Sequence, residues 1–171
     1  GGNPQATLLG DGARVTARQA ALVNGSASHA LDFDDVNLAM SGHPSVPVWP
    51  ALLALAESRG GTGRDVLAAF VAGFEMECRI GWLVMPAHYS IGFHSTGTLG
   101  TFGAAAACAH LLGFDQDQWQ RTLGIAGAQA AGLKSMFGTM CNPLHAGKAA
   151  APGLFAALLA ERGFPRHPEV L

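Results

Sequence analysis

The chain has 171 residues, of which 13% are charged and 23 are glycine, and its formal net charge at pH 7 is -2. This length suits one domain with a substantial buried core. The near-neutral charge argues against nucleic acid or a membrane surface as a partner. Because the charged share is about half of the roughly 25% found in average soluble domains, we expect a second domain, or a second copy in a homodimer formed through apolar helices, to cover part of the surface.

The cysteines and the chain start favour a cytoplasmic protein. Cys78, Cys108 and Cys141 are odd in number and widely spaced, which predicts neither a disulfide framework nor a zinc ribbon. The chain shows no basic segment followed by an apolar run at its start, so no signal peptide is expected. Between Arg79 and Asp115 there is no Asp, Glu, Lys or Arg. Polar residues interrupt this stretch, so it predicts a buried helix of a soluble protein and no membrane span.

Six apolar segments favour helices, and no segment shows the alternation of a strand, so the fold class is predicted to be all-α. The expected helices cover residues 16–31, 45–59, 66–83, 99–112, 115–131 and 149–162. Suitable caps support them: Thr16, Ser45, Ser95 or Thr96, and the capping boxes Thr62-x-x-Asp65 and Asp115-x-x-Gln118. Glycines and alanines in residues 97–107 would let a neighbouring helix approach closely. Residues 132–147 are expected to form a glycine-broken connection, and a further helix is expected to begin near His167.

Polar residues concentrate in three breaks between these segments, at residues 32–45, 86–96 and 138–148. The breaks hold four of the seven histidines: His43, His88, His94 and His145. Imidazole changes its charge near neutral pH, so it suits general acid–base chemistry. The three breaks together therefore predict a pocket for proton transfer beside a carboxylate.

The first break contains three carboxylates within four residues, Asp32, Asp34 and Asp35. If the preceding helix continues through them, Asp32 and Asp35 lie on one face. Such carboxylates repel one another unless a cation binds or one of them stays protonated. The alternative interpretation is that Asp34 and Asp35 cap helix ends and face water.

The other two breaks could bind anions. A helix starting near His94, Ser95 and Thr96 would present backbone N–H groups and hydroxyls to a carboxylate; the alternative is an ordinary N-cap beside a packed histidine. Lys148 is expected near a helix start, where a cation is unfavourable unless it meets a bound anion; the alternative is a lysine that faces solvent. Cys141 is predicted to be a small buried thiol and not a nucleophile.

Five strings extend in order over the whole chain: Gly-Gly-Asn-Pro-Gln-Ala-Thr (1–7), Ala-Leu-Asp-Phe-Asp-Asp (30–35), His-Pro-Ser (43–45), Gly-Phe-His-Ser-Thr-Gly (92–97) and Pro-Leu-His-Ala-Gly-Lys-Ala-Ala (143–150). They resemble the MmgE/PrpD family, whose members include 2-methylcitrate dehydratase, cis-aconitate decarboxylase and iminodisuccinate epimerase. The resemblance implies a helical domain that forms dimers, a smaller lid domain, and an active site between the two. It also implies that residues 1–171 are part of the helical domain, without the lid and some preceding helices, so that activity is expected of the full-length parent and is uncertain for this piece alone.

The resemblance also implies site residues. Asp32, His43 and His94 fall on positions implicated in catalysis, with His43 or His94 as acid or base and Asp32 as an orienting or proton-relaying carboxylate. Asn142, His145 and Lys148 are the expected substrate-binding residues. Asn142 stands where the family often has lysine, and Val36 where decarboxylase-like members have threonine. These two differences indicate a substrate other than cis-aconitate or a weakened site.

The leading hypothesis is a lyase or isomerase that uses no metal or organic cofactor. It would remove a proton alpha to a carboxylate of a small di- or tricarboxylate, with dehydration, decarboxylation or epimerisation. One alternative is a magnesium-dependent all-α diphosphate enzyme that uses the acidic cluster of residues 32–35. Another is a non-catalytic, dimerising helical fragment.

Overall fold

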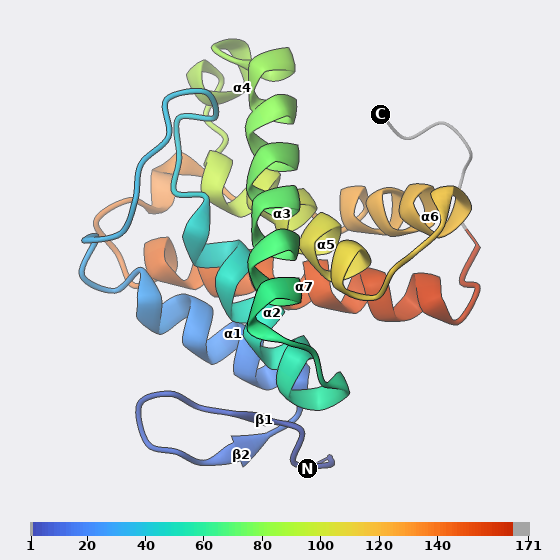
Figure 1. Ribbon diagram of the computed structural model, residues 1–171. Helices are drawn as coiled ribbons and strands as arrows, with labels where there is room; N and C mark the ends of the chain where they lie inside the picture. Colours follow the sequence, from blue (N-terminus) through green and yellow to red (C-terminus); the bar gives the residue numbers. More distant parts are fainter. Residues whose placement is uncertain (1, 166–171) are drawn as a thin grey trace.

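The computed structural model describes residues 2–165, and this part of the chain is a bundle of helices with one small hairpin (Figure 1). The all-α prediction is confirmed. In chain order the elements are β1 (Ala6–Thr7), β2 (Arg14–Val15), α1 (Ala17–Ser28), α2 (Ser45–Arg59), α3 (Gly63–Val84), α4 (Ala87–Ser90), α5 (Ser95–Leu111), α6 (Gln116–Gly127), the 3-10 helix η1 (Lys134–Met136) and α7 (Cys141–Glu161). No helix among residues 2–165 is long and apolar enough to cross a membrane. The helix expected near His167 lies outside the described residues.

Three helices begin at the caps that the sequence predicts. In each case the cap side chain accepts a hydrogen bond from the backbone N–H three residues on, and the side chain at that position returns to the cap backbone. The pairs are Thr16 with Gln19 in front of α1, Thr62 with Asp65 in front of α3, and Asp115 with Gln118 in front of α6. These reciprocal contacts satisfy backbone donors that a helix start leaves free.

Several expected boundaries were wrong. The first residues form the hairpin β1–β2, in which Ala6 pairs with Val15 and Thr7 with Arg14. Its strands have two residues each, which is too short for alternation to be visible in the sequence. The break at 86–96 contains the short helix α4, and α5 begins earlier than expected, with His94 itself at the N-cap position.

The largest boundary error concerns α7, which begins at Cys141 and so includes most of the expected connection. Pro143 is the third residue of this helix, where its missing N–H has no intrahelical acceptor to lose. Lys148 consequently lies about two turns inside α7 and not at its start. The argument that the helix dipole disfavours Lys148 therefore does not apply.

Helix α5 occupies the centre of the bundle and is buried from Ser95 to Ala109. It packs against α2, α3, α6 and α7. Small residues bring these backbones together, as the sequence predicts: a Cβ atom added to Gly73 of α3 would lie 2.6 Å from the carbonyl oxygen of Gly103 in α5. Because its side chains are so short, the backbone of α5 itself is the surface against which its neighbours pack.

Helices α1 and α7 also cross in close contact, side by side in Figure 1. A Cβ atom on Gly25 would lie 2.7 Å from the Cα atom of Gly147, and a Cβ atom on Gly147 would overlap the carbonyl oxygen of Leu22. This crossing brings the end of α1, where His29 is the C-cap residue, close to the first turns of α7, which carry His145.

Large apolar side chains remain exposed outside this core. The most exposed are Phe33 (95%), Leu31 (88%), Leu38 (86%), Leu83 (85%) and Met140 (85%). Their exposure agrees with the expectation that another domain or copy covers part of the surface. The homodimer itself stays a prediction.

Candidate active site

The three polar breaks meet around one cavity of about 250 Å³. Its lining residues come from all three segments and are Asp32, Ser41, His43, Tyr89, His94, Phe137, Gly138 and Asn142. The structure thus brings Asp32, His43 and His94 together from positions far apart in the chain. Their catalytic roles stay predictions.

The acidic cluster lies in the loop between α1 and α2 and not in a helix. Helix α1 ends at Ser28, and Asp32 has a left-handed backbone with φ of 51°, which a right-handed helix cannot contain. Asp32 and Asp35 therefore do not share a helix face. Asp35 accepts a hydrogen bond from the backbone N–H of Ser45 at 3.2 Å, so the capping interpretation is correct for this residue.

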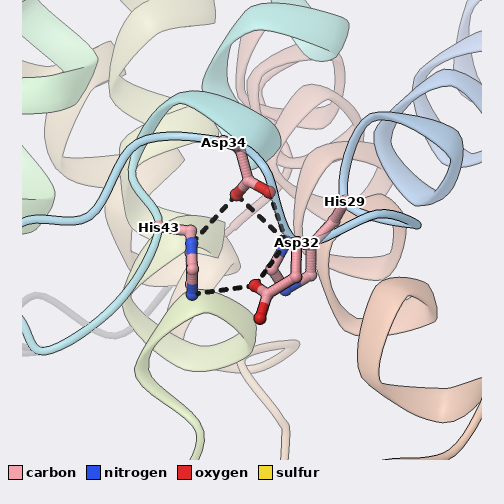
Figure 2. A group of neighbouring side chains, drawn as sticks. All are labelled: His29, Asp32, Asp34 and His43. Atoms are coloured by element: carbon pink, nitrogen blue, oxygen red, sulfur yellow. Dashed lines mark hydrogen bonds and ion pairs between the residues drawn. The ribbon is translucent and has the colours of Figure 1, made fainter.

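Asp34 lies between two imidazoles, as Figure 2 shows. Its two oxygens lie 2.9 and 3.0 Å from Nδ1 of His29, and Oδ2 lies 3.0 Å from Nδ1 of His43. The contact with His43 is an ion pair by distance and not a well-directed hydrogen bond. The two rings are 4.5 Å apart between centroids. The side chains of Asp34 and His29 are only 9% and 1% exposed, so both are buried beside His43, which lines the cavity.

The second carboxylate, Asp32, lies at the opposite edge of the His43 ring. Its Oδ1 atom is 3.6 Å from Nε2 of His43 and 3.9 Å from Nδ1 of His29. The side chain of Asp32 is 66% exposed, and it lines the cavity. His43 therefore has a carboxylate at each ring nitrogen, one buried and one accessible.

His94 and His145 form a second imidazole pair, with their Nδ1 atoms 2.8 Å apart. One nitrogen must donate and the other accept, so the pair shares one proton at this contact. Burial, followed by the charges of His145, His29 and His43, lowers the pKa of His94 to about 3. Burial and then the charge of Lys148 lower the pKa of His145. His94 therefore presents a neutral imidazole to the cavity at physiological pH.

Two helix starts also face the cavity. His94 is the N-cap of α5, and Asn142 is the second residue of α7, and neither helix has a side-chain cap hydrogen bond. The positive end of a helix dipole favours anions. A small carboxylate in this cavity would thus meet two such ends together with uncharged His94.

The remaining expected site residues lie around or away from the cavity. Asn142 lines the cavity. His145 lies behind it and contacts His94, which lines it. Lys148 lines a separate cavity of about 550 Å³ together with α1 residues such as Arg18. Cys141 is exposed at the start of α7, so its prediction as a buried thiol was wrong.

Two members of the site were not predicted in their observed roles. His29 was expected to lie inside a helix reaching Leu31, and Asp34 was considered only as a magnesium ligand in the alternative hypothesis or as a cap facing water. A helix end at Ser28 would have placed both residues in the same loop as His43, between α1 and α2. The sequence feature that could have revealed this pair is the short spacing of His29 and Asp34, five residues apart just after the end of α1.

Comparison of the sequence with known proteins identifies the family of this chain. The model of the MmgE/PrpD N-terminal domain matches residues 1–171. The chain belongs to the MmgE/PrpD family. It is 37% identical to human cis-aconitate decarboxylase over 163 residues, which is 92% of this chain and 34% of that protein. It is 35% identical to the cis-aconitate decarboxylase of Mus musculus, over 92% of this chain and 33% of that protein. It is 33% identical to the enzyme of Aspergillus terreus, over 96% of this chain and 35% of that protein. The chain thus spans about a third of the length of these relatives.

Proposed function

We propose that the protein containing this domain is a lyase or isomerase that transfers a proton at a carbon alpha to a carboxylate of a small di- or tricarboxylate. The observation that carries this proposal is the joint lining of one cavity by His43, with its two carboxylate neighbours, and by uncharged His94. A base, an orienting carboxylate and an anion-binding region are the groups that this chemistry needs. All three come from the chain itself, so no step of the proposal passes through a metal or an organic cofactor.

His43 is the better base of the two histidines. A base that accepts a proton becomes a cation, and Asp34 and Asp32 lie 3.0 and 3.6 Å from its two nitrogens. These carboxylates stabilise the imidazolium, and they hold the ring in place. Asp32, which is accessible, orients Nε2 of His43 or relays its proton.

His94 has the opposite electrostatic setting. Burial and the neighbouring imidazoles oppose a positive charge on this ring, so His94 serves as an uncharged hydrogen-bonding group for the substrate. His145 fixes it through the contact between their Nδ1 atoms. The side-chain amide of Asn142 and the starts of α5 and α7 would hold a substrate carboxylate. Lys148 acts on this cavity at most through its charge, which lowers the pKa of His145.

The similarity to cis-aconitate decarboxylases makes decarboxylation of cis-aconitate the first reaction to test. In that reaction carbon dioxide leaves and the allylic carbanion takes up a proton, so a protonated His43 would act as the acid, whereas dehydration and epimerisation need it as the base. Asn142 and Val36, which differ from the family's pattern, favour testing 2-methylcitrate dehydration and iminodisuccinate epimerisation beside it. No observation favours the magnesium-dependent diphosphate alternative, because Asp35 caps α2 and the other two carboxylates face imidazoles. A cytoplasmic location stays a prediction.

The test is turnover of the full-length protein on these three substrates. His43→Ala and His94→Ala should each lower kcat by about two orders of magnitude or more. His110→Ala is the matched control, because His110 is an exposed histidine near the far end of α5. Unchanged turnover in His43→Ala would remove this residue as the base. Turnover absent from every substrate, with a stable dimer by light scattering, would support the non-catalytic alternative.

A further inference from the structure

Four side chains of the α1–α2 connection converge closely enough to hold a metal ion. His29, Asp32, Asp34 and His43 each offer one nitrogen or oxygen atom, and these four atoms all lie within 4.8 Å of one another. Figure 2 shows Asp34 and Asp32 beside the two nitrogens of the His43 ring, with His29 next to both carboxylates. They form a mixed set of two nitrogen and two oxygen donors.

The spacing fits a small tetrahedral ion. Bonds of about 2.0–2.2 Å from zinc to nitrogen or oxygen place tetrahedral ligand atoms roughly 3.3–3.6 Å apart. Oδ2 of Asp34 lies 3.0 Å from Nδ1 of His29 and 3.0 Å from Nδ1 of His43, and Oδ1 of Asp32 lies 3.9 Å from Nδ1 of His29. These distances lie on both sides of the tetrahedral value, so small side-chain rotations are sufficient to form the site.

Unsatisfied nitrogens are a second, independent observation in this cluster. Nδ1 of His43 is buried, lies beside Asp34 and has no directed hydrogen bond. Nε2 of the almost fully buried His29 also has no hydrogen-bond partner. Buried polar atoms in folded proteins are normally satisfied, and an ion ligated by Nδ1 would satisfy His43.

The donor set also indicates which kind of ion binds. Magnesium and calcium prefer all-oxygen sites, whereas imidazole nitrogen suits zinc and its transition-metal neighbours. Asp35, the remaining carboxylate of the same loop, accepts a hydrogen bond from the backbone N–H of Ser45. We propose that His29, Asp32, Asp34 and His43 form a binding site for a divalent transition metal of the zinc type.

Binding at this site has a consequence that rests on the proposed function. A metal ligated by His43 and Asp32 would remove the base and its orienting carboxylate from the reaction. Zinc would therefore inhibit the lyase by occupying the site, and a chelator would restore turnover. The binding itself does not depend on the reaction.

The experiment is titration of the chelator-treated protein with zinc chloride by calorimetry, and with cobalt(II) by visible absorption. We expect one equivalent to bind, with the intense absorption bands of tetrahedral cobalt, and we expect no heat from magnesium. Asp34→Asn and Asp32→Asn should each weaken zinc binding at least tenfold. Asp32 is largely exposed, so its variant keeps the proposal testable if Asp34→Asn fails to fold. His110→Gln is the matched control and should bind zinc as the wild type does.

The outcomes separate this proposal from the proposed function. Absence of zinc binding to the folded wild type overturns the metal site, as does binding that Asp32→Asn and Asp34→Asn leave unchanged. Zinc binding in a protein without turnover on any carboxylate supports the metal site while overturning the lyase. Zinc binding that leaves turnover unaffected overturns only the inhibitory consequence.

Discussion

Replacement of Gly147 by alanine tests the crossing of α1 and α7, which brings His29 close to the first turns of α7 that carry His145. The added Cβ atom would overlap the carbonyl oxygen of Leu22 and the hydroxyl of Ser26, and it would lie 2.8 Å from the backbone nitrogen of Ser26. Ordinary contacts of a Cβ atom begin at 3.4 Å. Two of these neighbours are backbone atoms, so no side-chain rotation relieves the overlap, and the helices must separate by about 1 Å.

The cost follows from that separation. A gap of about 0.5–1 Å forfeits roughly a quarter to a half of each dispersion contact across it, and overpacked cores lose about 1–3 kcal/mol. We expect Gly147→Ala to lower the free energy of unfolding by about 2–3 kcal/mol. Because His145 lies two residues before Gly147, the same shift should disturb its 2.8 Å contact with His94.

Urea denaturation followed by circular dichroism measures this change. The matched control is Gly63→Ala at the first position of α3, where an added Cβ atom has nothing within 4 Å. That variant should be neutral or more stable by about 0.4–1 kcal/mol, since alanine restricts the unfolded chain. Equal stability of Gly147→Ala and wild type would refute the close crossing.

Three further predictions concern buried ionisable groups and a helix cap. Burial, and secondarily Asp35, raises the pKa of Glu77 well above 4.5, so its contribution to stability is present below pH 4.5 and is lost as pH rises toward the folded pKa. Glu77→Gln should therefore match the wild type near pH 4 and exceed its stability increasingly toward pH 8 in urea titrations; a constant difference would contradict this. The pKa of His94 falls from 6.5 to about 3, so stability should decrease as pH falls through this window, by about 1.4 kcal/mol per pH unit at most. His94→Asn should show a shallower acid dependence, and an unchanged slope would mean that His94 titrates normally. Thr62→Ala removes the capping box of α3 and should cost about 1 kcal/mol in chemical denaturation, an effect that Thr62→Ser should largely avoid.

Local signals in the sequence were sufficient for most helices. The capping boxes at Thr62 and Asp115 depend on residues three apart, and a single sequence displays them. The start of α7 was missed because Pro143 and Gly147 resemble helix breakers. Pro143 is tolerated in the first turn, and Gly147 is required by contact with α1. That second reason is tertiary, and nothing near Gly147 in the sequence reveals it.

The site was predictable to the same extent. The three breaks were visible because polar residues are scarce, whereas the choice of Asp32, His43 and His94 within them rests on the resemblance to the MmgE/PrpD family. The pairing of Asp34 with His29 depends on the end of α1 at Ser28 and on the left-handed turn at Asp32. Asparagine and aspartate adopt that conformation more easily than most residues, but the sequence does not show which of three adjacent aspartates does so.

The burial of α5 restricts how this cavity can change among relatives. His94 begins a helix whose backbone touches its neighbours directly, so larger residues there would push the bundle apart. The loop that holds Asp32 is also restricted, because its Met40 is fully buried against Gly81 of α3. The turn before α7 lines the cavity at Gly138, where an added Cβ atom would meet nothing within 4 Å. The shape of the cavity should therefore vary more readily at that turn than at His94, whose position the packing of α5 fixes.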